Sequence, residues 1–164
     1  LMIQTYLKAF GLGVVVGMRA LVSPALLGRK LTGSAPAEQP ETPLHYVTRP
    51  AVVRALEVLA VTELLTDKLP GIPNRTIPFQ FGGRIVSAAT CGAFLSQVEG
   101  AEIPVGAVAS VLGTVAGTLA FFRLRQWLTH EVGLPDPVVA LAEDALCVCG
   151  GWAIVNSVRI RQPA

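Results

Sequence analysis

The sequence predicts an all-α protein, a polytopic transmembrane bundle of about five spans built on an internal repeat. Its composition is the first observation, because hydrophobic residues make up 52% of the 164 residues and charged residues only 15%, against about 25% charged in soluble domains. The second is residues 103–122, which carry no charge and reach the ~20 residues that a helix needs to cross a bilayer. The third is a helix end that occurs twice, at residues 64–74 and 127–136.

The two helix ends share one order of residue types. In each copy Leu-Thr closes an apolar run, two ionisable residues follow, and a Gly-apolar-Pro turn comes next. Gly71 and Pro73 make this turn in the first copy, and Gly133 and Pro135 make it in the second, where one residue is deleted. Glycine and proline at these positions prevent the helix from continuing, so each copy marks the end of a span.

A weaker similarity upstream extends the repeat, because GMRALVSPA contains Arg19 and GGRIVSAA contains Arg84 at a similar distance before the two helix ends. Self-similarity at a fixed offset indicates duplication. We predict one membrane domain over residues 1–164, with repeat units at about 6–74 and 82–136 and a final helix at about 137–158. Units two spans apart are parallel, unless a hairpin in the first or third segment inverts them.

The first predicted helix covers residues 6–27 and contains Arg19 within its apolar run. Pro24 removes a backbone donor, so it should bend or end this helix near Ser23. Residues 32–50 are polar and rich in proline, which predicts the one long loop of the chain.

The other predicted helices cover residues 51–68, 81–98, 104–130 and 137–158. Pro104 and Pro137 fall in the first turns of the last two helices, where a missing N–H does no harm. Asp136 precedes the last helix and is available as its N-cap.

Small residues recur at every fourth position in two of these helices. Ala9, Gly13 and Gly17 form such a line in the first helix, and Gly113 and Gly117 belong to one in the fourth. Lines of this kind let helix backbones approach closely. We favour packing within one chain over dimerisation as the role of these lines. A homo-oligomer is nevertheless expected for the protein.

Five spans divide the basic residues evenly between the two sides of the membrane. One side would hold Lys8, Lys68, Arg75, Arg123 and Arg125, and the other would hold Arg29, Lys30, Arg49, Arg159 and Arg161. Orientation follows the excess of Lys and Arg in short loops. The sequence therefore does not choose a direction, and insertion both ways (dual topology) is left open.

Ionisable residues within or beside the predicted spans are the candidate functional residues, because a charge near the bilayer centre costs several kcal/mol. They are Arg19, Glu63, Asp67, Arg84, Glu143 and Asp144. We expect Arg19 to pair with an acid of the second helix and Arg84 with an acid of the last. A surplus carboxylate beside a polar cavity could then bind a proton or a cation.

Two functions of different classes fit these charges. In a small-solute or ion transporter, or a channel-like protein, the charges line the path. In a non-catalytic scaffold or lipid-binding protein, they are buried ion pairs that fix the register of the helices. A water-accessible cavity at Glu63 or Glu143 favours the first function, and a dry, fully paired core favours the second.

Other classes of function have little support in the sequence. It contains no GxSxG, HExxH, P-loop or Rossmann motif, so an enzyme is not favoured, although Asp67, Lys68, Asn74 and Arg75 could act on lipid head groups. The three cysteines lie in apolar runs and are expected to pack there, so neither a metal nor a cofactor is predicted. A formal net charge of +2 is too small to suggest nucleic acid.

Four segments of the chain carry a family resemblance. They are GMRA in the first helix, ELLTDKLPGIPNR after the second, GGRIVSAA opening the third and GLPDPVVALAEDAL opening the last. Together, over about residues 11–153, they resemble a bacterial family of small integral membrane proteins, the domain of unknown function DUF4126. The resemblance implies an integral protein of the bacterial inner membrane, and it brings no activity, cofactor or catalytic residue with it.

Overall fold

The computed structural model describes residues 2–32, 43–66 and 78–160. Within these residues every regular element is a helix, which confirms the predicted all-α class. The helices are α1 (Met2–Met18), α2 (Val22–Thr32), α3 (Pro43–Val47), α4 (Pro50–Thr66), α5 (Pro78–Glu99), α6 (Ile103–His130) and α7 (Asp136–Asn156). The last four correspond to the predicted second to fifth helices, with ends that differ by a few residues.

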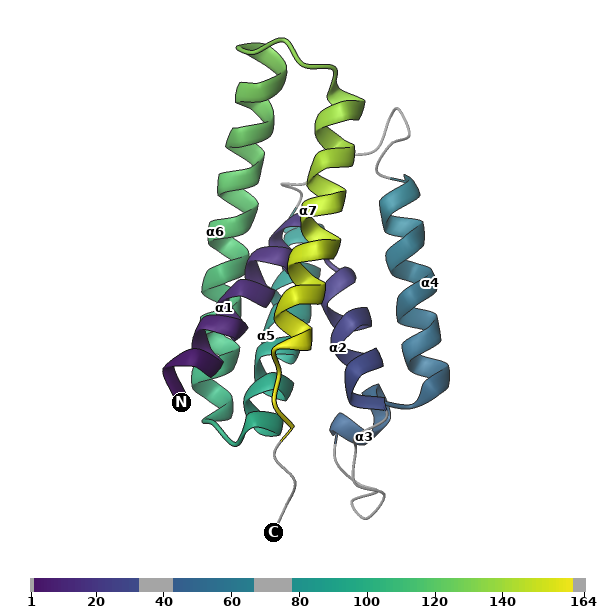
Figure 1. Ribbon diagram of the computed structural model, residues 1–164, viewed down its shortest axis with the longest axis vertical. Helices are drawn as coiled ribbons and strands as arrows, with labels where there is room; N and C mark the ends of the chain where they lie inside the picture. Colours follow the sequence, from purple (N-terminus) through teal and green to yellow (C-terminus); the bar gives the residue numbers. More distant parts are fainter. Residues whose placement is uncertain (1, 33–42, 67–77, 161–164) are drawn as a thin grey trace.

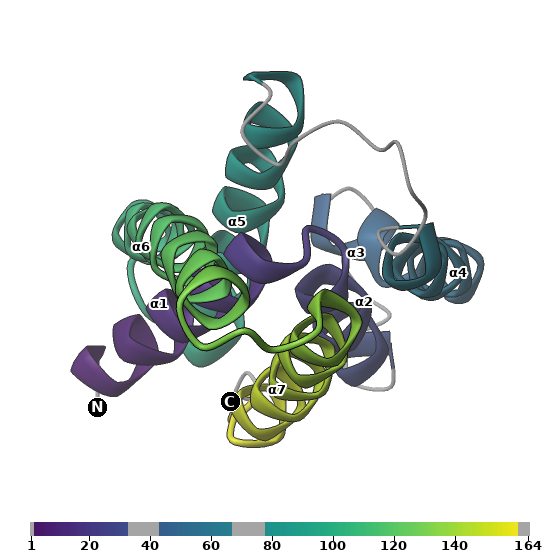
Figure 2. The ribbon, with the colours of Figure 1, turned by 90° about the horizontal axis from the view of Figure 1, so that it is seen from above.

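The first predicted helix consists of two helices, and the chain turns back between them. α1 rises from the lower end of the molecule to its middle, and α2 returns toward the same end (Figures 1 and 2). The break lies at residues 19–21 rather than near Ser23. The structure therefore contains the hairpin in the first segment that the sequence left open, and it has no single span over residues 6–27.

Pro24 explains why the break comes before Ser23. A continuous helix would press the Pro24 ring against the carbonyl of Ala20, four residues earlier, and Pro24 has no N–H to donate to that carbonyl. The chain instead ends α1 at Met18 and places Pro24 in the first turn of α2, where no intrahelical N–H is required. The Ala20 carbonyl then accepts a hydrogen bond from Ser87 Oγ of α5 at 2.7 Å.

Two predicted turns have different outcomes. The predicted loop at residues 32–50 contains the short helix α3 in its described part. The turn between α4 and α5, with Asp67, Gly71 and Pro73, lies outside the described residues. Because that turn is one copy of the repeated helix end, the internal repeat stays a prediction.

The turn between α6 and α7 contains Gly133, whose φ of +75° is a conformation that other residues rarely adopt. The predicted N-cap at Asp136 is wrong, since Pro135 occupies the N-cap position of α7 and no side chain caps that helix. The Asp136 carboxylate instead accepts hydrogen bonds from Arg125 Nε and Nη2 of α6, at 2.9 and 2.8 Å. This ion pair ties the two helices together beyond the end of the hairpin of α1 and α2 (Figure 1).

The core lies around α1, which packs mainly against α6 and α5. Leu12 and Val16 of α1 are fully buried. The small residues of the two predicted lines meet at the crossing of α1 and α6. A Cβ atom on Gly13 would lie 1.9 Å from the Ser110 carbonyl oxygen, and one on Gly113 would lie 2.1 Å from the Phe10 carbonyl oxygen. The two backbones are thus in direct contact within one chain.

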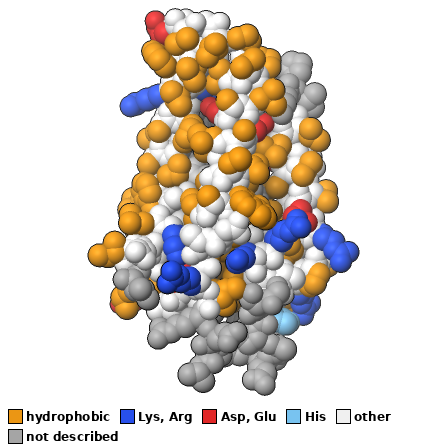
Figure 3. Space-filling view, in the orientation of Figure 1, with side chains coloured by type: hydrophobic (Ala, Val, Ile, Leu, Met, Phe, Trp, Pro, Cys, Tyr) orange, Lys and Arg blue, Asp and Glu red, His pale blue; other side chains and the backbone are white. Residues whose placement is uncertain are grey.

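The outer faces of the helices are apolar, and hydrophobic side chains cover most of the face shown in Figure 3 above a basic lower third. Leu112 and Leu119 of α6 and Leu141 and Leu146 of α7 are each more than half exposed. In the described part of the chain, α6 and α7 are long and apolar enough to cross a membrane, whereas α1 is apolar but shorter. Two candidate spans are fewer than the five that the sequence predicts.

The crossing of α1 and α6 gives a first prediction. Gly13→Ala should lower the free energy of unfolding by about 1–3 kcal/mol, the usual effect of overpacking, because the new methyl group meets a backbone carbonyl. Gly150→Ala in α7 is the matched control, since a Cβ there meets nothing within 4 Å and alanine favours the helix. Thermal unfolding in detergent measures both. Equal melting temperatures for the two variants would contradict the close approach.

Candidate functional site

The turn between α1 and α2 exposes backbone groups that no helix satisfies. The end of a helix leaves its last carbonyls without intrahelical donors, and the start of the next leaves its first N–H groups without acceptors. Here these groups include the carbonyls of Gly17 and Ala20 and the N–H groups of Ala20 and Leu21. All of them are bound by side chains from other helices.

Glu63 of α4 binds the N–H groups at the start of α2. Its Oε1 accepts from the Ala20 N–H at 2.9 Å and its Oε2 accepts from the Leu21 N–H at 3.0 Å. A carboxylate at this place also interacts favourably with the positive end of the helix dipole. Glu63 therefore caps α2 from another helix, a role usually filled by a residue just before the helix.

Arg84 and Ser87 of α5 bind the carbonyls on the other side of the turn. Arg84 is buried, and its Nη1 donates to the Gly17 carbonyl at 2.8 Å. The same carbonyl accepts from Thr118 Oγ1 of α6 at 3.3 Å. Arg84 thus places a positive charge at the end of α1, where the helix dipole is negative.

Arg19 lies in the turn itself and is only 2% exposed. Its Nε and Nη2 both donate to Asp144 Oδ1 of α7, at 2.8 and 2.5 Å. We expected an acid of the second predicted helix as its partner. Glu63 of that helix binds the backbone, and Asp67 lies outside the described residues, so this pairing stays a prediction. The turn is therefore joined to α7 through a buried ion pair.

A second contact between an arginine and a buried acid joins α6 to α7. Arg125 Nη1 contacts Glu143 Oε2 at 3.5 Å, and the same guanidinium holds Asp136. Glu143 and Asp144 are both buried. Neighbouring acids of α7 thus contact two different arginines, one in the hairpin turn and one on α6.

A cavity of about 330 Å³ opens beside the turn. Its walls come from the turn, α4 and α5, and the residues that line it are Ala20, Leu21, Glu63, Thr66, Gln80, Gly83, Arg84 and Ser87. Pockets that bind small molecules have volumes from about 300 Å³ upward. With a carboxylate, a guanidinium, hydroxyl groups and an amide on its walls, this cavity can hold a small hydrophilic solute or an ion.

The structure brings some of the predicted residues together and separates others. Arg19, Glu63 and Arg84 meet at the hairpin turn, and Asp144 reaches it from α7. Gly133 lies in the turn between α6 and α7, which Figure 1 places at the far upper end of the molecule. Asp67 lies outside the described residues.

Sequence analysis missed Ser87, Thr118 and Arg125 as participants in this site. Ser87 could have been found, because a serine follows the arginine closely in both similar segments. Ser87 comes three residues after Arg84, and Ser23 comes four residues after Arg19. Thr118 gives no such signal, since a threonine in an apolar helix commonly bonds within its own helix. Among the described residues, no three His, Cys, Asp or Glu side chains gather as a metal site would require.

Comparison with known proteins gives one match. A family model described as a domain of unknown function, DUF4126, matches residues 7–157. No curated protein and no solved structure matches the chain.

The cap on α2 gives a second prediction. Glu63→Gln should lower the free energy of unfolding by about 1–3 kcal/mol. The amide has one acceptor oxygen for two backbone N–H groups, and its own NH₂ group would face one of them. The control is Glu57→Gln on the same helix, where the carboxylate makes an exposed ion pair with Arg29 at 3.3 Å and should contribute little.

Thermal unfolding of the two glutamine variants in the same detergent measures this difference. A Glu63→Gln protein as stable as the Glu57→Gln protein would show that the cap does not hold the hairpin.

Proposed function

We propose that this chain, which belongs to the DUF4126 family, is an integral membrane protein that lets a small hydrophilic solute or an ion pass beside the hairpin turn of α1 and α2. The observation that supports this function is the cavity at the turn, whose walls include the charged side chains of Glu63 and Arg84. In transporters, interrupted helices commonly form substrate sites near the middle of the bilayer. Irregular backbone at that depth is tolerated where it is buried in protein or lines a cavity.

Membrane location is supported by the outer surface. α6 and α7 pass the length and composition test for membrane spans, and their exposed faces are rich in leucine. Trp127 near the end of α6 and Trp152 near the end of α7 are both more than half exposed. Figure 1 places the end of α6 at the top of the molecule and the end of α7 in its lower half, and tryptophans are favoured at the two membrane surfaces.

The hairpin also gives the protein a direction in the membrane. Because α1 begins and α2 ends at the lower end of the molecule (Figure 1), Lys8 lies at the same end as the basic residues of α2. Among the described residues that end carries Lys8, Arg29, Lys30, Arg49 and Arg159, and the upper end carries Arg123 and Arg125. By the rule that Lys and Arg stay inside, the lower end faces the cytoplasm. This excess is counted over the described residues alone, because Lys68, Arg75 and Arg161 lie outside them.

One observation favours the alternative function, a non-catalytic scaffold. Both oxygens of Glu63 already accept backbone hydrogen bonds, and Arg19 already pairs with Asp144. In a non-catalytic scaffold these contacts would only hold the hairpin in place. The two functions differ in whether solute moves through the cavity, so the test must fill the cavity without removing any of these contacts.

Gly83→Leu makes such a test. Gly83 lines the cavity, and a Cβ on it meets nothing within 4 Å, so a leucine side chain can occupy the space without a clash at its Cβ. Gly82→Leu is the matched control on α5, because its Cβ also has open space and it does not line the cavity. Both changes favour the helix by up to about 1 kcal/mol, so neither should unfold the protein.

Flux is measured in proteoliposomes that hold gradients of protons, sodium, potassium, chloride or glycerol. We expect the wild-type protein to dissipate at least one gradient faster than protein-free vesicles, the Gly82→Leu protein to match it, and the Gly83→Leu protein to lose most of the flux. Equal flux through both leucine variants would contradict passage beside the turn. If no gradient decays faster with the wild-type protein, the scaffold function is supported instead.

A further inference from the structure

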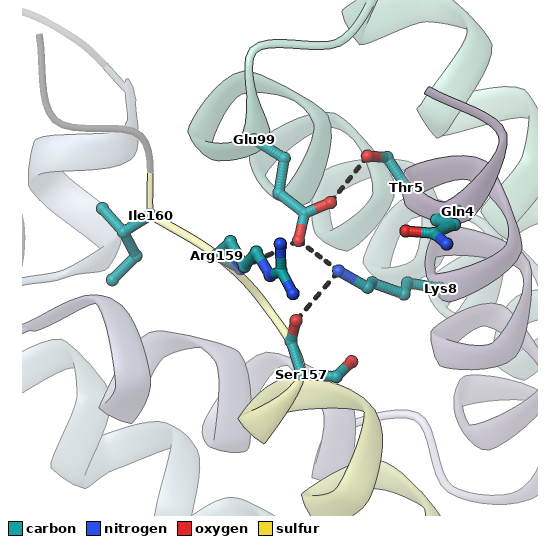
Figure 4. A pocket seen from close by; sticks show the side chains of 7 residues that line it. All are labelled: Gln4, Thr5, Lys8, Glu99, Ser157, Arg159 and Ile160. Carbon is teal, nitrogen blue, oxygen red and sulfur yellow. Dashed lines mark hydrogen bonds and ion pairs between the residues drawn. The ribbon is translucent and has the colours of Figure 1, made fainter. Parts of the chain in front are cut away.

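A second cavity lies at the lower end of the molecule, away from the hairpin turn. It has a volume of about 480 Å³. Figure 4 shows side chains from the start of α1, from the end of α5 and from the segment after α7 converging on it. The residues used below are Gln4, Thr5, Lys8, Glu99 and Arg159, all of which line the cavity.

Among the described residues that line this cavity Glu99 is the one acid, and its carboxylate is already hydrogen-bonded. Oε2 accepts from Thr5 Oγ1 at 2.6 Å, and Oε1 accepts from Lys8 Nζ at 2.6 Å and from the Arg159 backbone N–H at 2.9 Å. Burial alone would raise the pKa of Glu99, but the hydrogen bonds from Lys8, Thr5 and Arg159 outweigh it and lower the pKa below its usual range. Glu99 therefore stays ionised and offsets one of the two cations.

Two cationic side chains of the cavity have N–H groups left to donate. The Arg159 guanidinium has no hydrogen-bond partner in the described part of the chain, and Lys8 Nζ uses two of its three N–H bonds, on Glu99 and on the Ser157 carbonyl. The Gln4 amide lies on the same face of α1 as Lys8, one turn earlier. With Glu99 offsetting one of the two cations, the described residues of the cavity carry a net positive charge and N–H groups that can still donate.

The surroundings of the cavity are apolar and exposed. Ile3 and Leu7 of α1, next in the chain to Gln4 and Lys8, are 74% and 64% exposed. Trp152, in the last turns of α7, is 53% exposed, and tryptophan is favoured at the level of lipid head groups. A ligand in this cavity would thus have a polar site beside surfaces that suit hydrocarbon.

We propose that this cavity binds the phosphate group of an anionic phospholipid, with Arg159 and Lys8 as donors and the acyl chains on the apolar surface of α1 and α7. Guanidinium groups suit phosphate oxygens because they donate hydrogen bonds in a planar fork. A soluble phosphate ester would gain the same hydrogen bonds but none of the apolar contacts. This inference rests on the membrane location proposed above and is independent of solute passage.

Thermal unfolding of the full chain in detergent tests the site, with phosphatidylglycerol, phosphatidylcholine and soluble glycerol phosphate as three separate additions. We expect phosphatidylglycerol to raise the melting temperature saturably, at roughly tenfold lower concentration than phosphatidylcholine. The reason is that a hydrogen bond to a charged group increases affinity by about tenfold or more. Glycerol phosphate should have little effect. The Gly83→Leu protein, whose change is in the other cavity, should respond to phosphatidylglycerol as the wild type does, even if solute passage fails.

Arg159→Gln is the test variant and Arg29→Gln its matched control. Both remove one positive charge from the lower end, but Arg29 is 70% exposed in its side chain and pairs with Glu57 rather than lining the cavity. Arg159→Gln should weaken the effect of phosphatidylglycerol roughly tenfold, and Arg29→Gln should leave it unchanged. Equal losses in the two variants, equal effects of the two lipids, or an equal effect of glycerol phosphate would each overturn the proposal.

Discussion

The arrangement of the helices depends on the backbone groups that Pro24 leaves exposed at the hairpin turn. In an apolar environment each unsatisfied carbonyl or N–H is costly, and water cannot replace the missing helix bonds. The turn is therefore stable only if Glu63, Arg84 and Ser87 reach it. These side chains come from α4 and α5, so a local break in one segment fixes where two distant helices must lie.

Close packing of α1 against α6 also helps to satisfy the backbone groups at the end of α1. The glycines at this crossing bring the backbones near enough for Thr114 and Thr118 of α6 to donate to the carbonyls of Gly13 and Gly17, at 2.9 and 3.3 Å. With side chains at the crossing, α6 would stand too far away for these hydroxyl groups to reach. Small residues thus do two things here, because they permit packing and they complete the hydrogen bonding of the helix end.

The sequence was sufficient to identify α4 to α7 and several residues of the site, but not the hairpin of α1 and α2 or the backbone groups that these residues bind. Arg19, Glu63 and Arg84 stand out because charges inside apolar segments are rare. The backbone partners of Glu63 and Arg84 could not be derived, since a straight first helix would satisfy the Ala20 N–H and the Gly17 carbonyl within itself. Pro24 indicated a break, yet its steric effect acts four residues earlier, and only contacts with other helices decide between a bend and a reversal.

The proposed passage of a solute and the stabilisation of the hairpin would both involve Glu63. Glu63 is at once a cap of α2 and part of the cavity wall, so any cation or proton that binds its carboxylate weakens the bonds to the Ala20 and Leu21 N–H groups. Under the proposed function, binding in the cavity would therefore be coupled to the position of α2, because the helix would lose these two hydrogen bonds. A transporter needs such coupling between its ligand and a movable element, whereas a scaffold would gain nothing from placing its main cap beside open space.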